Sequence, residues 1–377
     1  MNIINKKFRF SNLVKFTLNL REKKLFQKFL LDKFAYLLPF DLYWCNIDGN
    51  CLSSLHEVFL LLDNNYVEDC FSFLRFNYVH EFIKLAICSP NWALFLNLGV
   101  KYDRTRKLNG FISSTFRKII INNKLALCSE INFLCLQKNL RRKFFVQELI
   151  KEITRRLNCF GITTAIYTTG LPFLKPLLNT SYFYNQLNSP PSYHLNLKKS
   201  EKLTNSNLEK LESWKNFKCV KKYDLKNIEN LKNIRKGFKK KKIYKHFSLQ
   251  DFSYWVRFIE GFKYTFMYEN TSLTDKNTII SLYSLPCKTI KSRKPYYFYD
   301  VYFYYGIKFI KNKIFIEKTL SICKIIGFDL FYILGGIFPE KDLLNLHFRK
   351  GENKINFYLI GRKSKRSVSL ENGLIFF

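Results

Sequence analysis

Several signals that define common classes of protein are missing from this sequence. No run of about 18 uncharged apolar residues occurs, so we expect no transmembrane segment. The 10 cysteines include no C-x-x-C pair and the 5 histidines no H-E-x-x-H cluster, so we predict no metal site. No signal peptide precedes the cysteines, and cysteines scattered in this way are typical of reduced thiols in a cytoplasmic protein.

Acidic residues are scarce: 29 Asp and Glu stand against 63 Lys and Arg, which gives a formal net charge of +34. The chain also has only 14 Gly and 9 Pro but 39 Phe. A/T-rich codons produce this skew, so we attribute much of the charge to coding bias. The rival interpretation is nucleic-acid binding, which a strongly basic chain always invites. Because the basic residues are spread through the chain, without zinc spacing, an RNP-like run or a repeat, we predict no nucleic-acid partner.

The most informative stretch is residues 130–170. Residues 131–136 are strand-like, and the apolar spacing of residues 146–157 predicts a helix. Its apolar stripe consists of Val146, Leu149, Ile150, Ile153 and Leu157. The charged residues, Glu152 and Arg156 among them, fall off this stripe, as a surface helix requires. Residues 162–168 form a second apolar run, so the stretch predicts a β-α-β unit with a right-handed connection.

A basic turn joins the first strand to the helix. It holds Lys138, Arg141, Arg142 and Lys143. A strand that runs through a turn into a helix N-terminus directs backbone N–H groups and the positive end of the helix dipole at one spot. The turn therefore predicts a phosphate or pyrophosphate ligand. The alternative is a solvated basic turn in a basic protein.

The amino-acid sequence of this stretch resembles that of a known family. Residues 130–135 read EINFLC, residues 152–156 read EITRR and residues 167–170 read YTTG. In this order, they resemble the acyl-CoA core of the eukaryotic glycylpeptide N-myristoyltransferases, a family related to the acetyltransferase superfamily. Further segments from residue 38 to the end resemble the same family, among them NYVED at residues 65–69 and RFNY at residues 75–78.

The resemblance implies an α/β (α+β) fold of two pseudo-symmetric, acetyltransferase-like halves, each with a mixed sheet flanked by helices. We expect a basic N-terminal segment at residues 1–37 and an acyl-CoA-binding half at residues 38–188. A Lys/Asn-rich connecting region follows at residues 189–248, and a peptide-binding half at residues 249–377.

The function that the resemblance implies is transfer of a myristoyl group from myristoyl-CoA to the N-terminal glycine amine of client proteins. The amine would attack the thioester directly, without a metal, and we expect the enzyme to be a monomer. Three alternatives stay open. They are an acyltransferase with another chain-length or peptide preference, a degenerate member that binds acyl-CoA without turnover, and a nucleic-acid-binding protein.

The expected catalytic groups also follow from the resemblance. The chain ends in an apolar run, and the family uses its terminal carboxylate as the base, which assigns that role to the α-carboxylate of Phe377. The alternative is a terminal strand tucked into a sheet. The backbone N–H groups of Phe133 and Leu134 match the family's oxyanion donors, and Asn132 and Thr168 match the positions that hold the attacking amine.

Two binding sets are implied in the same way. The residues expected to bind acyl-CoA are Lys138, Leu140, Arg141, Arg142, Lys143, Phe144 and Val146. The residues expected to bind the peptide are Glu68, Asp69, Phe76, Tyr78, Tyr182, Tyr184, Ser281 and Gly351. Cys70 follows the acidic pair where the family continues with acids, and Tyr184 replaces a family His, so the preference for a downstream Lys is an open question. Cys135 has no His, Asn or Asp placed to activate it, so we predict a buried core thiol.

Overall fold

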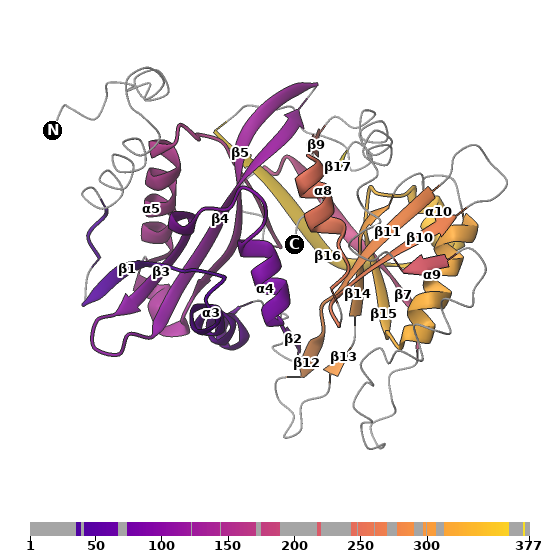
Figure 1. Ribbon diagram of the computed structural model, residues 1–377, viewed down its shortest axis with the longest axis horizontal. Helices are drawn as coiled ribbons and strands as arrows, with labels where there is room; N and C mark the ends of the chain where they lie inside the picture. The colour runs from indigo at the N-terminus through magenta and orange to yellow at the C-terminus, as the bar shows by residue number, and fades with distance from the viewer. Residues whose placement is uncertain are drawn as a thin grey trace.

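In the part of the chain that the structure describes, a mixed sheet of 14 strands is flanked by helices (Figure 1), and this confirms the predicted fold class. The computed structural model describes residues 35–38, 41–66, 74–121, 123–143, 145–170, 175–188, 217–219, 243–246, 248–259, 261–269, 277–289, 297–298, 300–306, 313–361 and 372–373. The basic segment up to residue 34 and most of the connecting region lie outside these residues.

The sheet is continuous from one end of the molecule to the other. Its strands follow one another in the order β1 (Leu42–Asn46), β3 (Asn97–Tyr102), β4 (Leu108–Ile121), β5 (Lys124–Leu136), β6 (Ala165–Thr169), β16 (Arg349–Ile360), β7 (Leu178–Gln186), β15 (Leu330–Leu334), β14 (Asp300–Gly306), β11 (Asn277–Ser284), β10 (Lys263–Glu269) and β8 (Phe217–Cys219). Two short strands complete it at the edge of β4: β9 (Ile243–Lys245) pairs with β4, and β17 (Asn372–Gly373) pairs with β9.

The predicted β-α-β unit is confirmed. β5 continues into a 3₁₀ helix, η2 (Lys138–Lys143), and then into α5 (Phe145–Cys159). β6 returns parallel to β5. Leu149, Ile153 and Leu157 are buried as predicted, whereas Ile150 is 45 % exposed, so its place on the buried stripe was wrong.

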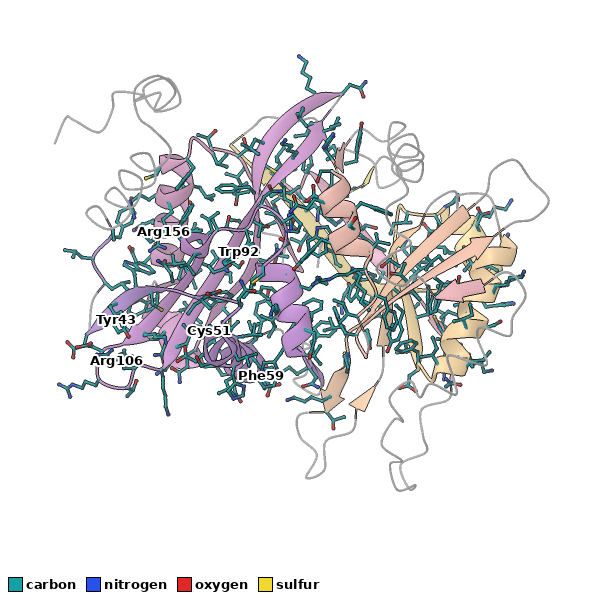
Figure 2. The ribbon with its side chains drawn as sticks, viewed as in Figure 1. Tyr43, Cys51, Phe59, Trp92, Arg106 and Arg156 are labelled. Carbon is teal, nitrogen blue, oxygen red and sulfur yellow. The ribbon has the colours of Figure 1, made fainter. Side chains whose placement is uncertain are left out.

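Helices cover both faces of the first part of the sheet. Neighbouring side chains on β4 point to opposite faces, so each face has apolar residues on which a helix packs. Ile112 packs in one core cluster with α5. Phe111 packs in another with α3 (Leu52–Asn65) and α4 (His80–Ile87), which α8 (Leu249–Val256) joins from the second part of the chain. In Figure 2, Arg156 marks the α5 side, and Cys51 and Phe59 mark α3.

The second part of the sheet has its own core. There α9 (Lys313–Ile326) and α10 (Glu340–Asn345) pack on residues of β7, β10, β11 and β15. A small sheet ties the two parts together, because β2 (Leu74–Phe76) pairs with β12 (Cys287–Thr289), which pairs with β13 (Tyr297–Phe298). Among the described helices, none is long and apolar enough to cross a membrane.

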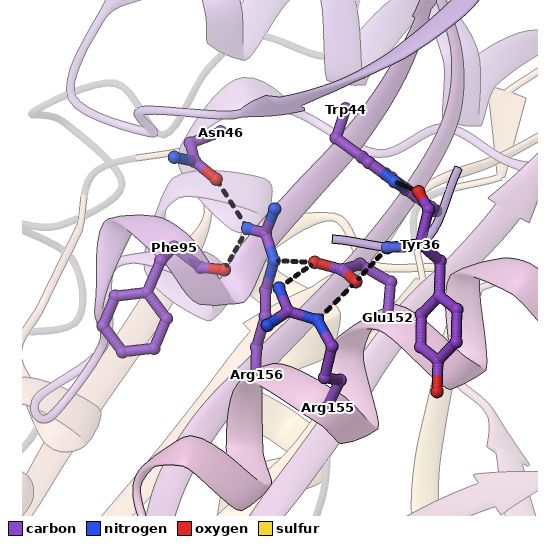
Figure 3. A network of polar contacts seen from close by, with 7 residues as sticks. All are labelled: Tyr36, Trp44, Asn46, Phe95, Glu152, Arg155 and Arg156. Carbon is purple, nitrogen blue, oxygen red and sulfur yellow. Dashed lines mark hydrogen bonds and ion pairs between the residues drawn. The ribbon is translucent and has the colours of Figure 1, made fainter. Parts of the chain in front are cut away.

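The charged face of α5 departs from the sequence prediction. Glu152 is 0 % exposed and Arg156 is also buried, so the expectation of a solvent-facing surface for these two residues was wrong. Arg156 Nε and Arg155 Nη2 donate to Glu152 Oε1 over 2.8 and 2.7 Å (Figure 3). Arg156 Nη1 also donates to Asn46 Oδ1 and to the Phe95 carbonyl, both over 2.7 Å.

This network explains the burial. β1 and η1 (Leu94–Leu96) pack over the side of α5 that carries Glu152, and the two arginines satisfy its carboxylate there. Burial by itself raises the pKa of Glu152, but the hydrogen bonds from Arg155 and Arg156 outweigh it and the pKa lies below its ordinary value. The EITRR motif therefore fastens the helix of the β-α-β unit to the edge of the sheet.

Candidate active site

β5 carries an irregularity at Phe133 and Leu134. Ser113 on β4 pairs with Asn132, and Phe111 pairs with Cys135, so a single β4 residue faces two on β5. Such a bulge takes one extra residue out of the hydrogen-bond ladder. The bulge therefore lies at the two residues whose N–H groups are the expected oxyanion donors.

Phe133 adopts a strained backbone conformation in this bulge. Its φ of 54° is in the left-handed region, which costs a bulky residue roughly 1–3 kcal/mol. Its buried ring makes edge contacts with Tyr78 and Phe82, with ring centroids 6.0 and 6.2 Å apart. Burial of this aromatic ring offsets the strain and fixes the direction of the backbone.

β5 and β6 separate immediately beside the bulge. They are paired at Ser129–Ala165 and at Glu130–Ile166 and at no later position that the structure describes. Asn132 and Thr168 each lie two residues beyond the last pair, so they stand on the two sides of the opening. Both are half-buried. Their expected role in holding the amine stays a prediction.

A pocket opens next to the bulge. Its volume is about 400 Å³. The residues that line it are Asn65, Tyr66, Leu134, Cys135, Leu136, Arg141 and Val146. Three of these, Leu134, Arg141 and Val146, belong to the predicted site, so the pocket brings an expected oxyanion donor together with residues of the expected acyl-CoA set.

Tyr66 contacts the bulge directly. Its ring centroid lies 6.0 Å from that of Phe133. Burial raises the pKa of Tyr66 well above its ordinary value, and a hydrogen bond with the backbone of Phe133 acts in the opposite direction. A backbone group that lowers the pKa of a phenol stabilises the phenolate, so the N–H of Phe133 is the donor and the Tyr66 oxygen the acceptor.

Arg141 forms the wall between the pocket and α3. Its Nε donates to the Leu136 carbonyl over 3.1 Å, and its Nη2 donates to the Asn65 carbonyl at the end of α3. The Lys138 backbone N–H donates to Asn65 Oδ1 over 3.2 Å. Arg141 thus links the turn after β5 to α3 and leaves part of its guanidinium exposed for a ligand.

The other members of the expected acyl-CoA set differ in exposure. Lys138 is exposed at the turn, whereas Leu140 is buried in the core under α5 and supports the turn from below. Arg142 and Lys143 belong to η2, but their side chains lie outside the described part of the structure, as does Phe144 altogether.

Cys135 is buried, as predicted. Its Sγ lies 3.9 Å from the Leu61 carbonyl. Burial raises the pKa of this thiol to about 12, although Arg141 lowers it. The thiolate that a nucleophile needs is therefore suppressed at neutral pH.

The expected peptide-binding residues divide into groups. Phe76 and Tyr78 lie with their ring centroids 6.0 Å apart and pack in the same core cluster as Phe133. Tyr182 and Tyr184 both contact Tyr332 of β15, at 6.2 and 6.1 Å. Tyr182 and Tyr332 pack against the Phe133 cluster as well, so aromatic residues from both parts of the sheet meet beside the bulge.

Two further members of that set have a different environment. Ser281 is fully buried, and its Oγ accepts a hydrogen bond from Thr265 Oγ1 over 3.1 Å. Gly351 lies in the irregular pairing of β16 with β7, where an added Cβ would be 3.1 Å from the Tyr182 carbonyl. Glu68, Asp69 and Phe377 lie outside the described residues.

A buried ion cluster fixes β5 before the bulge. Glu130 accepts from Arg117 Nε over 2.7 Å and from Lys245 Nζ over 3.1 Å. Burial raises the pKa of Glu130, but Lys245 and Arg117 outweigh it and the pKa lies below its ordinary value. Arg117 is completed by the Ser89 hydroxyl and the Pro90 carbonyl at 2.7 and 3.0 Å.

The sequence analysis did not assign Asn65, Tyr66 or Leu136 to the pocket. A signal for two of them was present, since Asn65 and Tyr66 open the NYVED motif that carries part of the resemblance. The ion cluster had no sequence signal beyond the glutamate of EINFLC, because Arg117 and Lys245 are distant in the chain and meet only through β9 and β4.

Comparison with known proteins gives a consistent result along most of the chain. The family model of the myristoyl-CoA:protein N-myristoyltransferase N-terminal domain matches residues 23–179, and that of the C-terminal domain matches residues 191–371. Glycylpeptide N-tetradecanoyltransferase of Plasmodium falciparum is 33 % identical over 340 residues, which cover 88 % of this chain and 82 % of the relative. Glycylpeptide N-tetradecanoyltransferase 2 of Bos taurus is 31 % identical over 363 residues, covering 90 % and 69 %.

A solved structure agrees with these relatives. The Saccharomyces cerevisiae N-myristoyltransferase with bound myristoyl-CoA matches with a TM-score of 0.73 and 26 % identity, covering 89 % of this chain and 82 % of the yeast chain. With both domain models matched and relatives above 30 % identity, the chain belongs to the myristoyl-CoA:protein N-myristoyltransferase family.

Proposed function

We propose that this chain transfers a myristoyl group from myristoyl-CoA to the N-terminal glycine amine of client proteins. The observation that carries the proposal is the bulge at Phe133 and Leu134, which lies beside both the opening between β5 and β6 and the pocket lined by Arg141. This arrangement supports a site at which acyl-CoA, the proposed backbone donors and the second substrate meet.

The thioester is already activated, so the enzyme needs no covalent intermediate. Attack by the amine moves negative charge onto the carbonyl oxygen, and preorganised N–H donors stabilise that charge. The N–H groups of Phe133 and Leu134 are the proposed donors. A strained backbone held by buried aromatic rings keeps such donors in position before the substrate arrives.

The amine must lose a proton before it attacks. We propose that the α-carboxylate of Phe377 is the base that accepts this proton, and that Asn132 and Thr168 hold the amine. Support comes from the direction of the last described residues of the chain. β17 runs parallel to β9, from the level of Ile121 to the level of Ile120 on β4, and thus toward the end of β4 that faces the bulge. A carboxylate in a water-poor site has a raised pKa and an amine there a lowered one, which makes the transfer feasible.

The peptide is proposed to bind along the aromatic residues of both parts of the sheet, with Phe76 and Tyr78 on one side and Tyr182 and Tyr184 on the other. Glu68, Asp69, Ser281 and Gly351 complete the proposed set. The pyrophosphate of the acyl-CoA is assigned to the turn before α5, which carries Lys138, Arg142 and Lys143, and Phe144, the next residue in the sequence, belongs to the proposed set.

We also propose that the protein acts as a monomer in the cytoplasm. The eight cysteines whose side chains the structure describes are all free thiols, which supports a reducing compartment.

Single-turnover transfer from myristoyl-CoA to two peptides that differ only in Gly or Ala at the first position tests the proposal. We expect acylation of the Gly peptide alone. Adding residues after Phe377 should abolish transfer but preserve myristoyl-CoA binding, since the extension removes the terminal carboxylate. An unchanged rate in the extended chain would contradict the assignment of the base. Saturable binding of myristoyl-CoA without transfer to either peptide would identify a degenerate binder instead.

A further inference from the structure

The hairpin formed by β4 and β5 projects beyond the strands beside it. β3 accompanies β4 only as far as Ser113, and β6 pairs with β5 only at Ser129 and Glu130. Residues 116–121 and 123–128 therefore extend past both neighbours, and Figure 1 shows the purple end of this hairpin rising at the top of the molecule. β9 supports it along one edge, at residues 119–121.

The two faces of the hairpin have opposite character. On the inner face, Ile119, Ile121, Ala126 and Cys128 are buried in a core cluster with residues of β6, β9 and β16. The inner face therefore anchors the hairpin as a rigid element. On the outer face, strand alternation exposes apolar side chains instead.

Leu125 and Leu127 are the most exposed apolar residues of this outer face, at 59 % and 52 %. The half-buried Ile120 pairs with Leu125, and the exposed Lys118 pairs with Leu127. Exposed leucines scattered singly need no explanation, but two on adjacent outward positions of a rigid strand, with Ile120 beside them, form a small apolar patch.

The patch has basic surroundings. Residues 116–128 contain Arg117, Lys118 and Lys124 but no Asp or Glu. Arg117 is neutralised inside by Glu130, whereas Lys118 is exposed on the outer face, where it pairs with Leu127. Lys124 is exposed at the end of the hairpin, and it pairs with Ile121, so alternation places it on the opposite face from Leu125. The chain as a whole carries a formal net charge of +34.

We propose that the outer face of this hairpin docks on the surface of an anionic membrane. Leucine side chains that enter the interface region gain from burial, and lysines beside them are attracted to anionic headgroups. Lys118 lies directly opposite Leu127 on this face, and Lys124 adds a second positive charge at the end of the hairpin. The docking stands on the hairpin alone and is independent of the acyl-transfer reaction.

The geometry favours a membrane over a protein occupant. A second copy of this chain would bring the same positive charge to the contact and repel the first. A protein partner would need a cavity that fits a projecting hairpin, whereas a fluid interface adapts to it. An anionic lipid surface satisfies both the apolar and the basic part of the patch.

Sedimentation of the full chain with vesicles tests the proposal. The vesicles consist of phosphatidylcholine alone or with about 30 % phosphatidylserine, a composition that gives a negative surface potential. We expect binding to the anionic vesicles that weakens as salt rises. The double variant L125N/L127N should bind them roughly tenfold more weakly, because it loses the apolar insertion. The variant K118Q/K124Q should bind roughly tenfold more weakly and with a smaller salt dependence.

Leu52→Asn is the matched control, because Leu52 is 78 % exposed at the start of α3, away from the hairpin. It should bind vesicles like the wild type. Thermal unfolding and myristoyl-CoA binding of each variant check that the fold is intact. Vesicle binding of L125N/L127N equal to that of the wild type overturns the proposal, and so does a wild type that does not sediment with anionic vesicles. Self-association that L125N/L127N abolishes would show that a second copy covers the patch, which also overturns it.

Discussion

The guanidinium carbon of Arg117 lies 5.2 Å from the centroid of the Trp255 ring. Arg117 belongs to β4 and Trp255 to α8, so this cation–π contact joins the two segments that the family models match separately. The same guanidinium binds Glu130 three residues before the bulge. One side chain therefore contributes both to the contact between the two segments and to the position of the proposed oxyanion donors.

Glu130→Gln should destabilise the protein strongly. The substitution leaves Arg117 and Lys245 in the interior without the carboxylate that they share, and loss of one partner of a buried pair costs roughly 3–5 kcal/mol. Urea unfolding measures the effect. Glu148→Gln is the control, because its pair with the exposed Lys151 should contribute less than about 1 kcal/mol. Equal effects of the two substitutions would contradict the structural role of the cluster.

Acid should destabilise the protein through the same group. The folded-state pKa of Glu130 lies below its ordinary value, so the ion cluster contributes its full stability above the unfolded-state pKa of about 4.3. That contribution decreases as the pH falls below this value and is lost once the pH passes the folded-state pKa. The pKa of Glu152 also lies below its ordinary value, so its ion pairs with Arg155 and Arg156 likewise lose their contribution to stability as the pH falls. Melting temperatures measured between neutral pH and the acid range should fall more steeply for the wild type than for Glu130→Gln.

Lys263→Met should stabilise the protein at neutral pH. Lys263 is 0 % exposed, and burial first and the charge of Arg257 second hold its pKa well below the ordinary value. An apolar side chain of similar length avoids the cost of burying the amine, so the free energy of unfolding should rise.

The pH dependence of this effect checks its cause. Between the folded-state pKa and the ordinary value of about 10.4, the unfolded chain binds more protons at Lys263 than the native one, so wild-type stability rises with pH. The gain from Lys263→Met should therefore shrink toward alkaline pH. Lys350→Met, at an exposed site, should have little effect at any pH. A gain that stays constant with pH would mean that the charge of Lys263 is not its source.

Tyr66→Phe should bind myristoyl-CoA more tightly than the wild type. In the absence of substrate the Tyr66 hydroxyl accepts from the Phe133 N–H, the donor that we assign to the thioester oxygen. Without the hydroxyl, that competition disappears, and binding should improve roughly two- to tenfold while the free protein loses about 1 kcal/mol of stability. Titration calorimetry and thermal unfolding measure the two effects. Tyr43→Phe on β1 should change neither, and weaker binding by Tyr66→Phe would mean that Tyr66 holds the substrate instead.

The local elements were predictable from the sequence because their signals are local. The apolar spacing of residues 149, 153 and 157 identified α5, and the apolar runs on either side identified β5 and β6. Periodicity reports which face of a helix is apolar but not what packs on the other faces. For this reason Glu152 and Arg156 looked solvent-exposed, although β1 and η1 bury them.

The site was predictable only in part. The family resemblance pointed to Phe133 and Leu134, but the bulge depends on the register between β4 and β5, which no single strand encodes. The positive φ of Phe133 likewise has no sequence signal, since glycine is the usual residue there. The connecting region was expected to be polar, and the sequence analysis predicted no strand in it. β8 and β9 are short strands in this region, and they form because they pair with β10 and β4, more than because of their own residues.

At the centre of the sheet, strands from the two parts of the chain pair with each other, and this affects folding during synthesis. β7 precedes the connecting region but pairs with β15, and β16 comes from the last 30 residues yet pairs with β6. During synthesis the β-α-β unit leaves the ribosome long before the strand that covers its edge. Contacts of this sequence separation form slowly and late. The nascent chain therefore exposes an open strand edge at β6 until β16 has been synthesised, and an unpaired edge of this kind is prone to aggregation during that interval.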